Sequence, residues 1–308
     1  MEQEIQFFIN DQSGRGEGRD RAEWARSQLP GLRISSQIPN SAQELSLLCS
    51  QLKEANTRAA VVFGGDGTVN YAIRGLIESG IPLFPYPSGT ANDLANEHGI
   101  TGSTDQMTKL LNQGSIHEVN LLSVNGIPFS TVAGIGIGSY ICDEYNRLRQ
   151  SNPTLLKASG RLSCEIYSLL AVKRILSSWG TGHRVRISSN EVSQTIETSV
   201  LMICNQSRLA GNLTVAPDQT PSCKTFTVLH HQDPSGFSTL KSLLAMKFGR
   251  LDQSFKSFKT EKLVLESLTD EPLSVFGDGE ILTSGTRLEF MRHPKKLRIF
   301  SEGSGSKN

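Results

Sequence analysis

The segment Gly64–Asn70 holds the residues whose types and spacing are best suited to chemistry. It reads Gly-Gly-Asp-Gly-Thr-Val-Asn and lies between an apolar run, 59–63, and a helical pattern, 71–77. Glycines after a buried strand let a phosphate approach the backbone, and a following helix N-terminus offers unpaired N–H groups. The carboxylate of Asp66 would repel phosphate oxygens, so it needs another task, such as binding Mg²⁺ or a ribose hydroxyl. The segment therefore predicts a site for a nucleotide phosphate.

A second glycine turn follows in Leu83–Ala95. Its prolines end a strand, its glycine permits a turn, and Thr90, Asn92 or Asp93 can cap a new helix. In their order and spacing, the two segments resemble the paired glycine motifs of the diacylglycerol-kinase-type lipid kinases. That family includes sphingosine and ceramide kinases and bacterial single-chain relatives. The resemblance is specific, because each motif is short but the pair is hard to reach by chance.

The resemblance implies that the two segments build a site for ATP and Mg²⁺. The residues it assigns to the nucleotide are Asn10, Ser13, Gly14, Ser36, Gly64, Gly65, Asp66, Gly67, Thr68, Val69, Asn70 and Thr90. Asp66 is also the expected contact of the metal that ATP brings, and Asn92 and Asp93 are assigned to the substrate. In the first loop Asp11 replaces the proline of relatives, which reduces rigidity and leaves the chemistry unchanged.

Two further carboxylates, Asp278 and Glu280, flank a glycine between two expected strands. This turn resembles the Asp-Gly-Glu motif of the lipid kinases. Phosphorylating an alcohol needs a base near the hydroxyl, and Mg²⁺ to neutralise charge on the phosphates. We expect Glu280 to be the base and Asp278 its catalytic partner, acting across a cleft between two domains. The alternative is a plain Asp-Gly hairpin turn.

The elements that must position these motifs change character along the chain. Up to about residue 120, strands alternate with helical patterns, which predicts a mostly parallel sheet covered by helices on both faces. From about Leu121, short alternating strands separated by turn residues predict an antiparallel sandwich. Two of these expected strands are 127–132 and 194–203. We therefore expect an α/β chain with an N-terminal three-layer α/β nucleotide-binding domain and a C-terminal antiparallel β-sandwich domain.

The expected domain limits follow from this change. They are 1–122 for the nucleotide-binding domain, 123–290 for the lipid-binding sandwich, 291–301 for a last strand that returns to the first domain, and 302–308 for a disordered tail.

A third glycine segment, Val132–Ser139, lacks the third glycine and the acidic residue of a dinucleotide-binding fingerprint. Close packing of strands and helix explains its glycines, and direct ligand contact is the alternative.

Composition narrows the function classes. Lys and Arg (31) nearly balance Asp and Glu (30), for a net charge of +1, which argues against a general nucleic-acid binder. Five singly placed cysteines without a Cys-x-x-Cys spacing argue for a reducing compartment and against a zinc site. The sequence shows neither an apolar run long enough to span a bilayer nor a signal-peptide pattern. We therefore expect a cytoplasmic protein that associates peripherally with membranes.

Two segments could contact a membrane, and one difference from the family pattern concerns an accessory metal site. The apolar and basic segments 155–176 and 237–248 could rest on an anionic membrane, and packing on the sandwich is the alternative. Relatives hold a structural Mg²⁺ in an acidic stretch after the position of Pro217. Here Pro221–Lys224 reads Pro-Ser-Cys-Lys, a poor set of ligands for a hard cation. We expect the accessory metal to be missing or weakly held.

The sequence as a whole predicts an ATP- and Mg²⁺-dependent kinase that phosphorylates the hydroxyl group of a diacylglycerol-like or sphingoid lipid. A kinase for NAD or a sugar phosphate is disfavoured, because those families lack the Pro87–Asp93 segment. Two alternatives are a catalytically inactive nucleotide-binding lipid sensor and a kinase for a soluble hydroxyl acceptor. A membrane-surface scaffold with a vestigial ATP fold is the least favoured.

Overall fold

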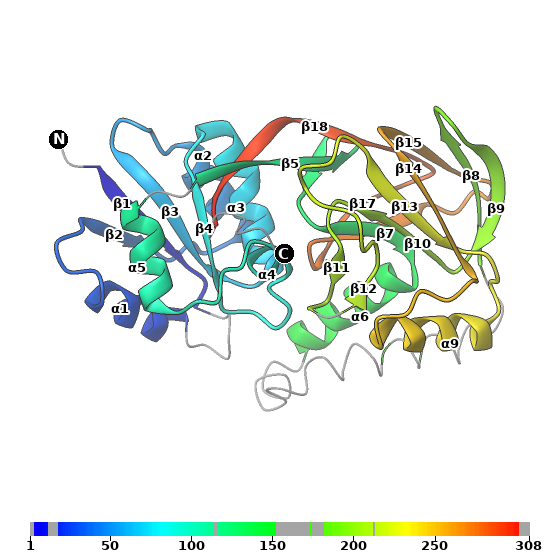
Figure 1. Cartoon of the computed structure of the whole chain (residues 1–308), viewed down its shortest axis with the longest axis horizontal. Helices are drawn as coiled ribbons and strands as arrows, with labels where there is room; N and C mark the ends of the chain where they lie inside the picture. Colours follow the sequence, from blue (N-terminus) through cyan, green and yellow to red (C-terminus); the bar gives the residue numbers. More distant parts are fainter. Residues whose placement is uncertain are drawn as a thin grey trace. The chain divides into compact units, whose positions relative to one another are not determined.

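The computed structural model describes residues 3–11, 18–113, 116–151, 170, 173, 182–211 and 213–301. The chain divides into two compact units, Met1–Asn120 with Pro294–Asn308, and Leu121–His293. Two strands, β5 (Ile116–Val124) and β18 (Arg287–Phe300), contribute one end to each unit. Figure 1 labels the elements along the chain.

The first unit is a parallel sheet covered by helices on both faces. Its strands run in the order β2-β1-β3-β4, and the C-terminal end of β18 pairs with β4. The strands are β1 (Glu4–Ile9), β2 (Ile34–Gln37), β3 (Thr57–Gly64) and β4 (Leu83–Pro87), and all of these pairs are parallel. The helices are α1 (Gly18–Ser27), α2 (Ala42–Ser50), α3 (Asp66–Ser79), α4 (Asp93–Glu97) and α5 (Thr104–Gln113).

Burial on both faces explains why the strands are so apolar. The run Ala59–Phe63 in β3 is completely buried, as is typical of parallel strands with helices on both sides. Helices α1 and α5 pack against one face, in a cluster that includes Phe7 and Phe63. Helices α2 and α3 pack against each other on the opposite face (Figure 1). Their close approach depends on Gly75, where a Cβ atom would lie 2.1 Å from the carbonyl oxygen of Ser46.

The second unit is an antiparallel sandwich. One sheet has the strand order β14-β13-β10-β7-β16-β17, and the other contains β18, β15, β8 and β9 together with β5 and β6. A cluster of buried aliphatic and aromatic side chains from both sheets fills the space between them. The strands are β6 (Ile127–Phe129), β7 (Val132–Gly136), β8 (His183–Ser189), β9 (Ser193–Thr198), β10 (Val200–Cys204), β13 (Phe226–His231), β14 (Phe255–Thr260), β15 (Lys262–Ser267), β16 (Leu273–Gly277) and β17 (Glu280–Gly285).

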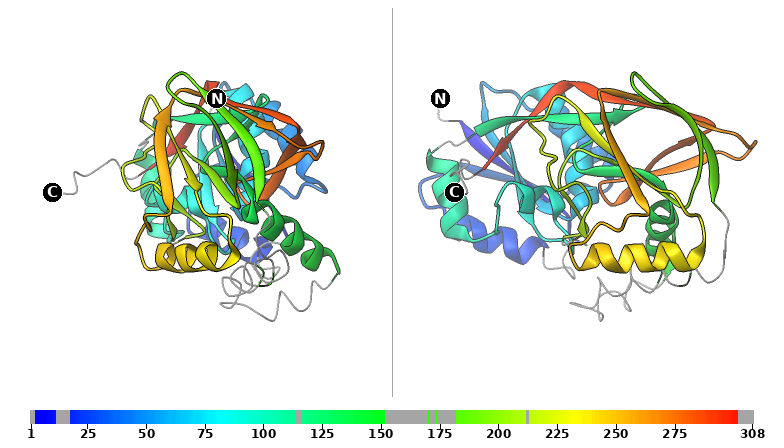
Figure 2. Two further views of the ribbon diagram at one scale, coloured as in Figure 1. Left: turned by 90° about the vertical axis from the view of Figure 1, so that its right-hand side faces the viewer. Right: turned by 45° about the vertical axis from the view of Figure 1, so that its right-hand side comes forward.

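Two helices and a small hairpin complete the described part of this unit. Helices α6 (Ile137–Ser151) and α9 (Gly236–Lys247) pack against the outer face of the six-stranded sheet, through a second apolar cluster. The hairpin consists of β11 (Arg208–Leu209) and β12 (Leu213–Thr214). Both helices are visible along the outside of the sandwich in Figure 2.

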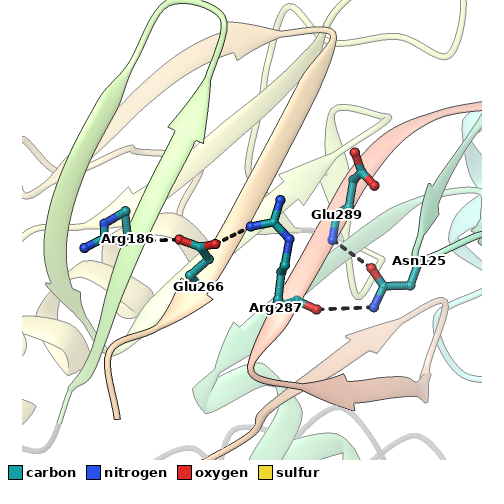
Figure 3. A network of polar contacts seen from close by, with 5 residues as sticks. All are labelled: Asn125, Arg186, Glu266, Arg287 and Glu289. Atoms are coloured by element: carbon teal, nitrogen blue, oxygen red, sulfur yellow. Dashed lines mark hydrogen bonds and ion pairs between the residues drawn. The ribbon is translucent and has the colours of Figure 1, made fainter. Parts of the chain in front are cut away.

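A turn and a row of charged side chains lie on the sheet that contains β18, β15 and β8 (Figure 3). Asn125 has a positive φ of 48°, and its side chain accepts from the Glu289 backbone N–H at 2.8 Å and donates to the Arg287 carbonyl at 3.4 Å. Glu266 pairs with both Arg186 and Arg287 across three neighbouring strands. All of these charges are partly or largely solvent-exposed, so each pair contributes little stability.

The expected fold class is confirmed: a three-layer α/β unit is followed by an antiparallel β-sandwich. Two strand predictions were wrong in detail. The expected strand 127–132 is divided between β6 and β7, and the expected strand 194–203 between β9 and β10. In each case one or two hydroxyl residues interrupt the strand and bind elsewhere, Ser130 and Thr131 in the first and Ser199 in the second.

Two other expectations lie largely or wholly outside the described residues. These are the disordered tail, 302–308, and most of the apolar and basic segment 155–176. Within the part of the chain that the structure describes, no helix is both long and apolar enough to cross a membrane.

Candidate functional site

Three loops leave the carboxyl ends of neighbouring parallel strands in the first unit. Ile9 of β1 pairs with Phe63 of β3, and Gly64 of β3 pairs with Pro87 of β4. The loops that follow these strands therefore begin side by side. The strand order reverses its direction between β1 and β3, and ligands of open α/β sheets bind at such a switch point. The expected nucleotide motifs thus lie where this fold places ligands.

The first two loops are joined by a side-chain hydrogen bond. Asn10 Nδ2 donates to Thr68 Oγ1 at 2.8 Å, which links the end of β1 to the first turn of α3. A Cβ on Gly64 would lie 2.4 Å from the Thr68 Cβ, so this position requires glycine. Gly65 is the N-cap of the 14-residue helix α3 and has no side chain that could bind the first N–H groups. These N–H groups, at the positive end of the helix dipole, suit an anion.

Asp66 ties the two glycine segments together. One of its carboxylate oxygens accepts from the backbone N–H of Asn92 at 3.0 Å, and the other accepts from that of Asp93 at 2.6 Å. Because these N–H groups begin helix α4, Asp66 caps that helix from a distant part of the chain. The backbone of Asn92 is left-handed, with φ of 50°, which turns both donors toward the carboxylate.

The tip of the second loop is closed by Asn92. Its Oδ1 accepts from Gly89 N at 2.8 Å, and its Nδ2 donates to Gly89 O at 2.9 Å. A Cβ on Gly89 would lie only 2.5 Å from the Cα of Gly65. The two glycine turns therefore touch through their backbones, and a side chain on Gly89 would push them apart.

The remaining residues expected at this site have different environments. Asn70 is fully buried and accepts at Oδ1 from Arg74 Nε at 3.0 Å, so in this structure its side chain faces the protein interior. Val69 and Asp93 are also buried, whereas Gly67 is partly exposed and Thr90 is exposed.

Ser36 in β2 accepts a hydrogen bond from Arg26 Nη2 at 2.7 Å, which links Ser36 to helix α1 instead of to the glycine turns. Ser13 and Gly14 lie outside the described residues.

Burial controls the charge of two groups near these loops. Burial, with a smaller contribution from the charge of nearby His117, lowers the pKa of His98, at the end of α4, to about 4. Burial also raises the pKa of Tyr86 in β4, an effect that the positive charge of Arg21 opposes. Both groups are therefore uncharged at neutral pH.

A depression of about 430 Å³ lies elsewhere on this unit, between α2 and α3. It is lined by Gln43, Ser46, Leu47, Ser50, Tyr71, Arg74, Gly75 and Glu78. These residues belong to α2 and to the middle of α3, so the glycine turns at the start of α3 lie outside it. The motif geometry, and not this depression, defines the candidate site.

In the second unit, Asp278 and Gly279 form the two-residue turn between β16 and β17. Their φ angles of 48° and 80° are those of a type I′ hairpin. Asp278 is only 4% exposed, and its carboxylate accepts four hydrogen bonds. Ser130 N (2.8 Å) and Oγ (3.0 Å) donate to Oδ2, and Thr131 N (2.9 Å) and Oγ1 (2.6 Å) donate to Oδ1. Asp278 thus fixes the turn against the loop between β6 and β7.

Glu280 has a more open environment than Asp278. Its side chain is partly exposed, and Oε2 accepts from Asn146 Nδ2 of helix α6 at 3.1 Å. The same helix reaches the turn through Cys142, whose Sγ donates to Gly279 O at 3.2 Å. Glu280 is therefore held against α6 in a position that is partly exposed.

The third glycine segment serves packing, the first of its two expected roles. A Cβ on Gly134 would lie 2.2 Å from Leu201 O, and one on Gly138 would lie 2.3 Å from the ring of Phe276. Gly138 thereby lets α6 approach the strand that leads to Asp278.

Sequence reasoning did not find Ser130, Thr131, Asn146 or Asn205, which donates to Ser130 O at 2.8 Å. These residues belong to no motif and carry no spacing signal, because their partners are distant in sequence. The residues that the structure describes contain no group of three or more His, Cys, Asp and Glu side chains placed to hold a metal ion.

Comparison with known proteins agrees with this geometry. Residues 4–124 match the family model of the diacylglycerol kinase catalytic domain. A Mycobacterium tuberculosis protein named diacylglycerol kinase is 32% identical over 153 residues, which cover 47% of this chain and 50% of the relative. A Staphylococcus aureus protein that is provisionally named a lipid kinase is 22% identical over 258 residues, 80% of each chain.

Solved structures extend the likeness in fold to nearly the whole chain. A Bacillus anthracis protein described provisionally as a diacylglycerol kinase superposes with a TM-score of 0.75 at 17% identity, over 98% of each chain. A second structure, titled a diacylglycerol kinase from the same organism, gives 0.68 at 17% identity, over 98% of this chain and 97% of the other. At this identity the likeness shows the fold alone.

The match of residues 4–124 includes both glycine segments and the strands that carry them. The chain aligns with only about half the length of the M. tuberculosis relative. The resemblance expected from the glycine motifs is confirmed: residues 4–124, about two fifths of the chain, match the family model of the diacylglycerol kinase catalytic domain.

Proposed function

We propose that the protein transfers the γ-phosphoryl group of ATP to the hydroxyl group of a lipid, diacylglycerol-like or sphingoid, with Mg²⁺ as the accompanying ion. The observation that carries this proposal is the pair of hydrogen bonds from Asn92 N and Asp93 N to Asp66. They join the two glycine motifs, which are distant in sequence, into one site at the switch point of the sheet. ATP with Mg²⁺ supplies the phosphoryl group and neutralises its developing charge.

The residues present fit a nucleotide phosphate. The N-terminus of α3 offers N–H groups that no N-cap side chain occupies, and the contact between Gly65 and Gly89 keeps the loop backbones bare. In this proposal Asn10 and Thr68 fix the floor of the phosphate site, and Asp66 fixes the position of the second loop. The metal contact expected of Asp66 stays a prediction.

On the acceptor side, the proposal assigns proton removal to Glu280. A carboxylate oxygen of Glu280 takes the proton of the lipid hydroxyl group. At the same time the hydroxyl oxygen bonds to the γ-phosphorus, and the bond between the γ-phosphorus and the departing ADP breaks. Asp278 is proposed as a positioning residue, because Ser130 and Thr131 already occupy both of its oxygens. Asn146 orients the Glu280 side chain.

The same feature of Asp278 favours one other function, a nucleotide-binding lipid sensor without catalysis. If both acids of the Asp-Gly-Glu turn were needed for chemistry, the engagement of Asp278 would leave the enzyme incomplete. ATP consumption, followed with a coupled ADP assay, separates the two functions. A kinase consumes ATP only when both Mg²⁺ and lipid are added, whereas a sensor binds ATP and consumes none under any of these conditions.

Changing Asp66 to Asn is expected to weaken ATP binding by about ten- to a hundredfold. In the variant, the Nδ2 group would face a backbone N–H of the second loop. In the unchanged protein, a carboxylate oxygen at that place accepts a hydrogen bond from the same N–H. Isothermal titration calorimetry with ATP measures the change. Asp105→Asn is the matched control, since Asp105 also lies in the first turn of a helix but is exposed. An unchanged affinity in Asp66→Asn would remove Asp66 from the nucleotide site.

A further inference from the structure

Helix α9 and the turn after it expose an apolar stripe in the second unit. Phe237 is 69% exposed, Leu244 50% and Phe248 78%, and Leu251 follows at 41%. Positions 237, 244 and 248 are separated by seven and four residues, so they share one face of the helix with exposed Lys241. Large exposed apolar side chains gathered on one face indicate a surface that contacts something else.

The opposite face of α9 is buried and contains hydroxyl groups as well as apolar side chains. Thr239 and Ser242 are fully buried, and Thr239 Oγ1 lies 2.8 Å from Ser199 Oγ. Ser242 Oγ lies 3.0 Å from His231 Nε2 and donates to Asp252 Oδ2 at 3.1 Å. The inward face thus combines these hydroxyl groups with apolar side chains such as Met246, whereas Phe237 and Leu244 are exposed on the outward face. Packing of the sandwich explains the buried face and leaves the exposed phenylalanines without a role in the fold.

The charge around the stripe has one sign. Between Gly236 and Leu251 the chain has Lys241, Lys247 and Arg250 and no acidic residue. The flanking acids are already engaged: Asp233 accepts from Ser235 N at 2.9 Å, and Asp252 accepts from Ser242 and Ser254. Apolar side chains that alternate with cations along one segment complement a surface with an apolar interior and negatively charged groups at its boundary, and an anionic lipid bilayer has both properties.

We propose that the exposed face of α9, Phe237–Leu251, is the surface by which this protein docks on an anionic lipid bilayer. The phenylalanines insert among the lipids at the level of the headgroups, and the three cations contact the anionic headgroups. This docking role of α9 rests on the proposed function, because a lipid kinase must find its acceptor in a membrane.

Sedimentation with vesicles tests the surface without any turnover. The vesicles contain equal parts phosphatidylglycerol and phosphatidylcholine, and a second set contains phosphatidylcholine alone. The full-length chain is expected to bind the anionic vesicles more tightly, and less tightly as salt is raised. Replacing Phe237 and Phe248 together by Ser should weaken binding at least about tenfold. Lys241→Gln should weaken it about fivefold.

Matched controls lie in the other unit. Leu47→Ser removes an apolar side chain that is 56% exposed, and Lys53→Gln removes an exposed cation. Both controls should bind vesicles like the unchanged protein. Circular dichroism and the thermal unfolding midpoint check that every variant is folded, which is expected because the replaced side chains are exposed.

Three results would overturn the proposal. The first is that the unchanged protein fails to bind anionic vesicles, and the second is that the Phe237/Phe248 double variant binds them as well as the controls do. The third is that the double variant turns a dimer into a monomer without affecting vesicle binding, which would make a second copy of the chain the occupant.

Turnover of a short-chain diacylglycerol, dissolved as monomers, separates this proposal from the kinase proposal. The double variant should keep that turnover while losing vesicle binding. Vesicle binding without turnover in the unchanged protein would reject the kinase and leave the docking surface intact.

Discussion

Replacing Glu280 by Gln is expected to lower kcat for lipid phosphorylation by about 10²–10⁴-fold. An amide cannot take the proton of the acceptor hydroxyl, yet it is almost the same size as the carboxylate. Its oxygen can still accept from Asn146, so helix α6 should hold the side chain as before. The affinity for ATP should stay within about twofold, since Glu280 belongs to the other unit of the chain.

The measurement is initial rate against lipid concentration at saturating ATP, combined with calorimetric ATP binding. Glu271→Gln is the matched control, because Glu271 is an exposed acid shortly before the same hairpin. It should keep the rate of the unchanged protein. Turnover of Glu280→Gln close to that of Glu271→Gln would exclude Glu280 as the base.

Replacing Asp278 by Asn is expected to act on stability, lowering the free energy of unfolding of the second unit by about 2–5 kcal/mol. The carboxylate is buried and accepts four hydrogen bonds, and an amide can accept at one of its two ends only. The N–H and O–H of either Ser130 or Thr131 would then face an NH₂ group. Urea denaturation measures the change.

The control for this stability effect is Asp270→Asn, which alters an exposed acid and should change the unfolding free energy by less than about 0.5 kcal/mol. At a temperature where Asp278→Asn is folded, its turnover should exceed that of Glu280→Gln. Full stability together with lost turnover would contradict the positioning role and place Asp278 in the chemistry.

The fold class could be predicted because each part of it leaves a local pattern. The buried run Ala59–Phe63 followed by a glycine turn and a helical period is a local signal of a parallel strand and its crossover. The break between β6 and β7 has no such signal. Ser130 and Thr131 leave the strand to bind Asp278, which is 148 and 147 residues away. A contact at that separation is fixed by tertiary packing and is invisible in local periodicity.

In the candidate site, too, local patterns were predictable and long-range contacts were not. Motif spacing predicted which loops come together, since parallel strands place their carboxyl ends at one edge of the sheet. It did not predict what Asp66 does there, because a carboxylate beside glycines suits a metal as well as a backbone N–H. Its partners, 26 and 27 residues away, became evident only in three dimensions. The nucleotide role of these residues stays a prediction.

Helix α9 shows a further limit of the sequence. Composition indicated an apolar helix with lysines, and both membrane contact and packing on the sandwich were open. The structure assigns a side to each residue, with Met246 inside the apolar cluster and Phe237 outside it. Buried hydroxyls such as Ser242 obscure the amphipathic pattern, because they are polar residues on the inward face.

Transfer of labelled γ-phosphate from ATP to a lipid is the most direct test of whether this protein is a lipid kinase. The protein is incubated with Mg²⁺ and mixed micelles of diacylglycerol, monoacylglycerol, sphingosine, ceramide and phosphatidylglycerol, and the lipids are then separated. We expect a labelled lipid that disappears when Mg²⁺ is chelated and in Glu280→Gln, and its mobility identifies the acceptor. Unlabelled lipid throughout, from protein that binds ATP, would rule out the lipid kinase and favour the sensor or a soluble acceptor.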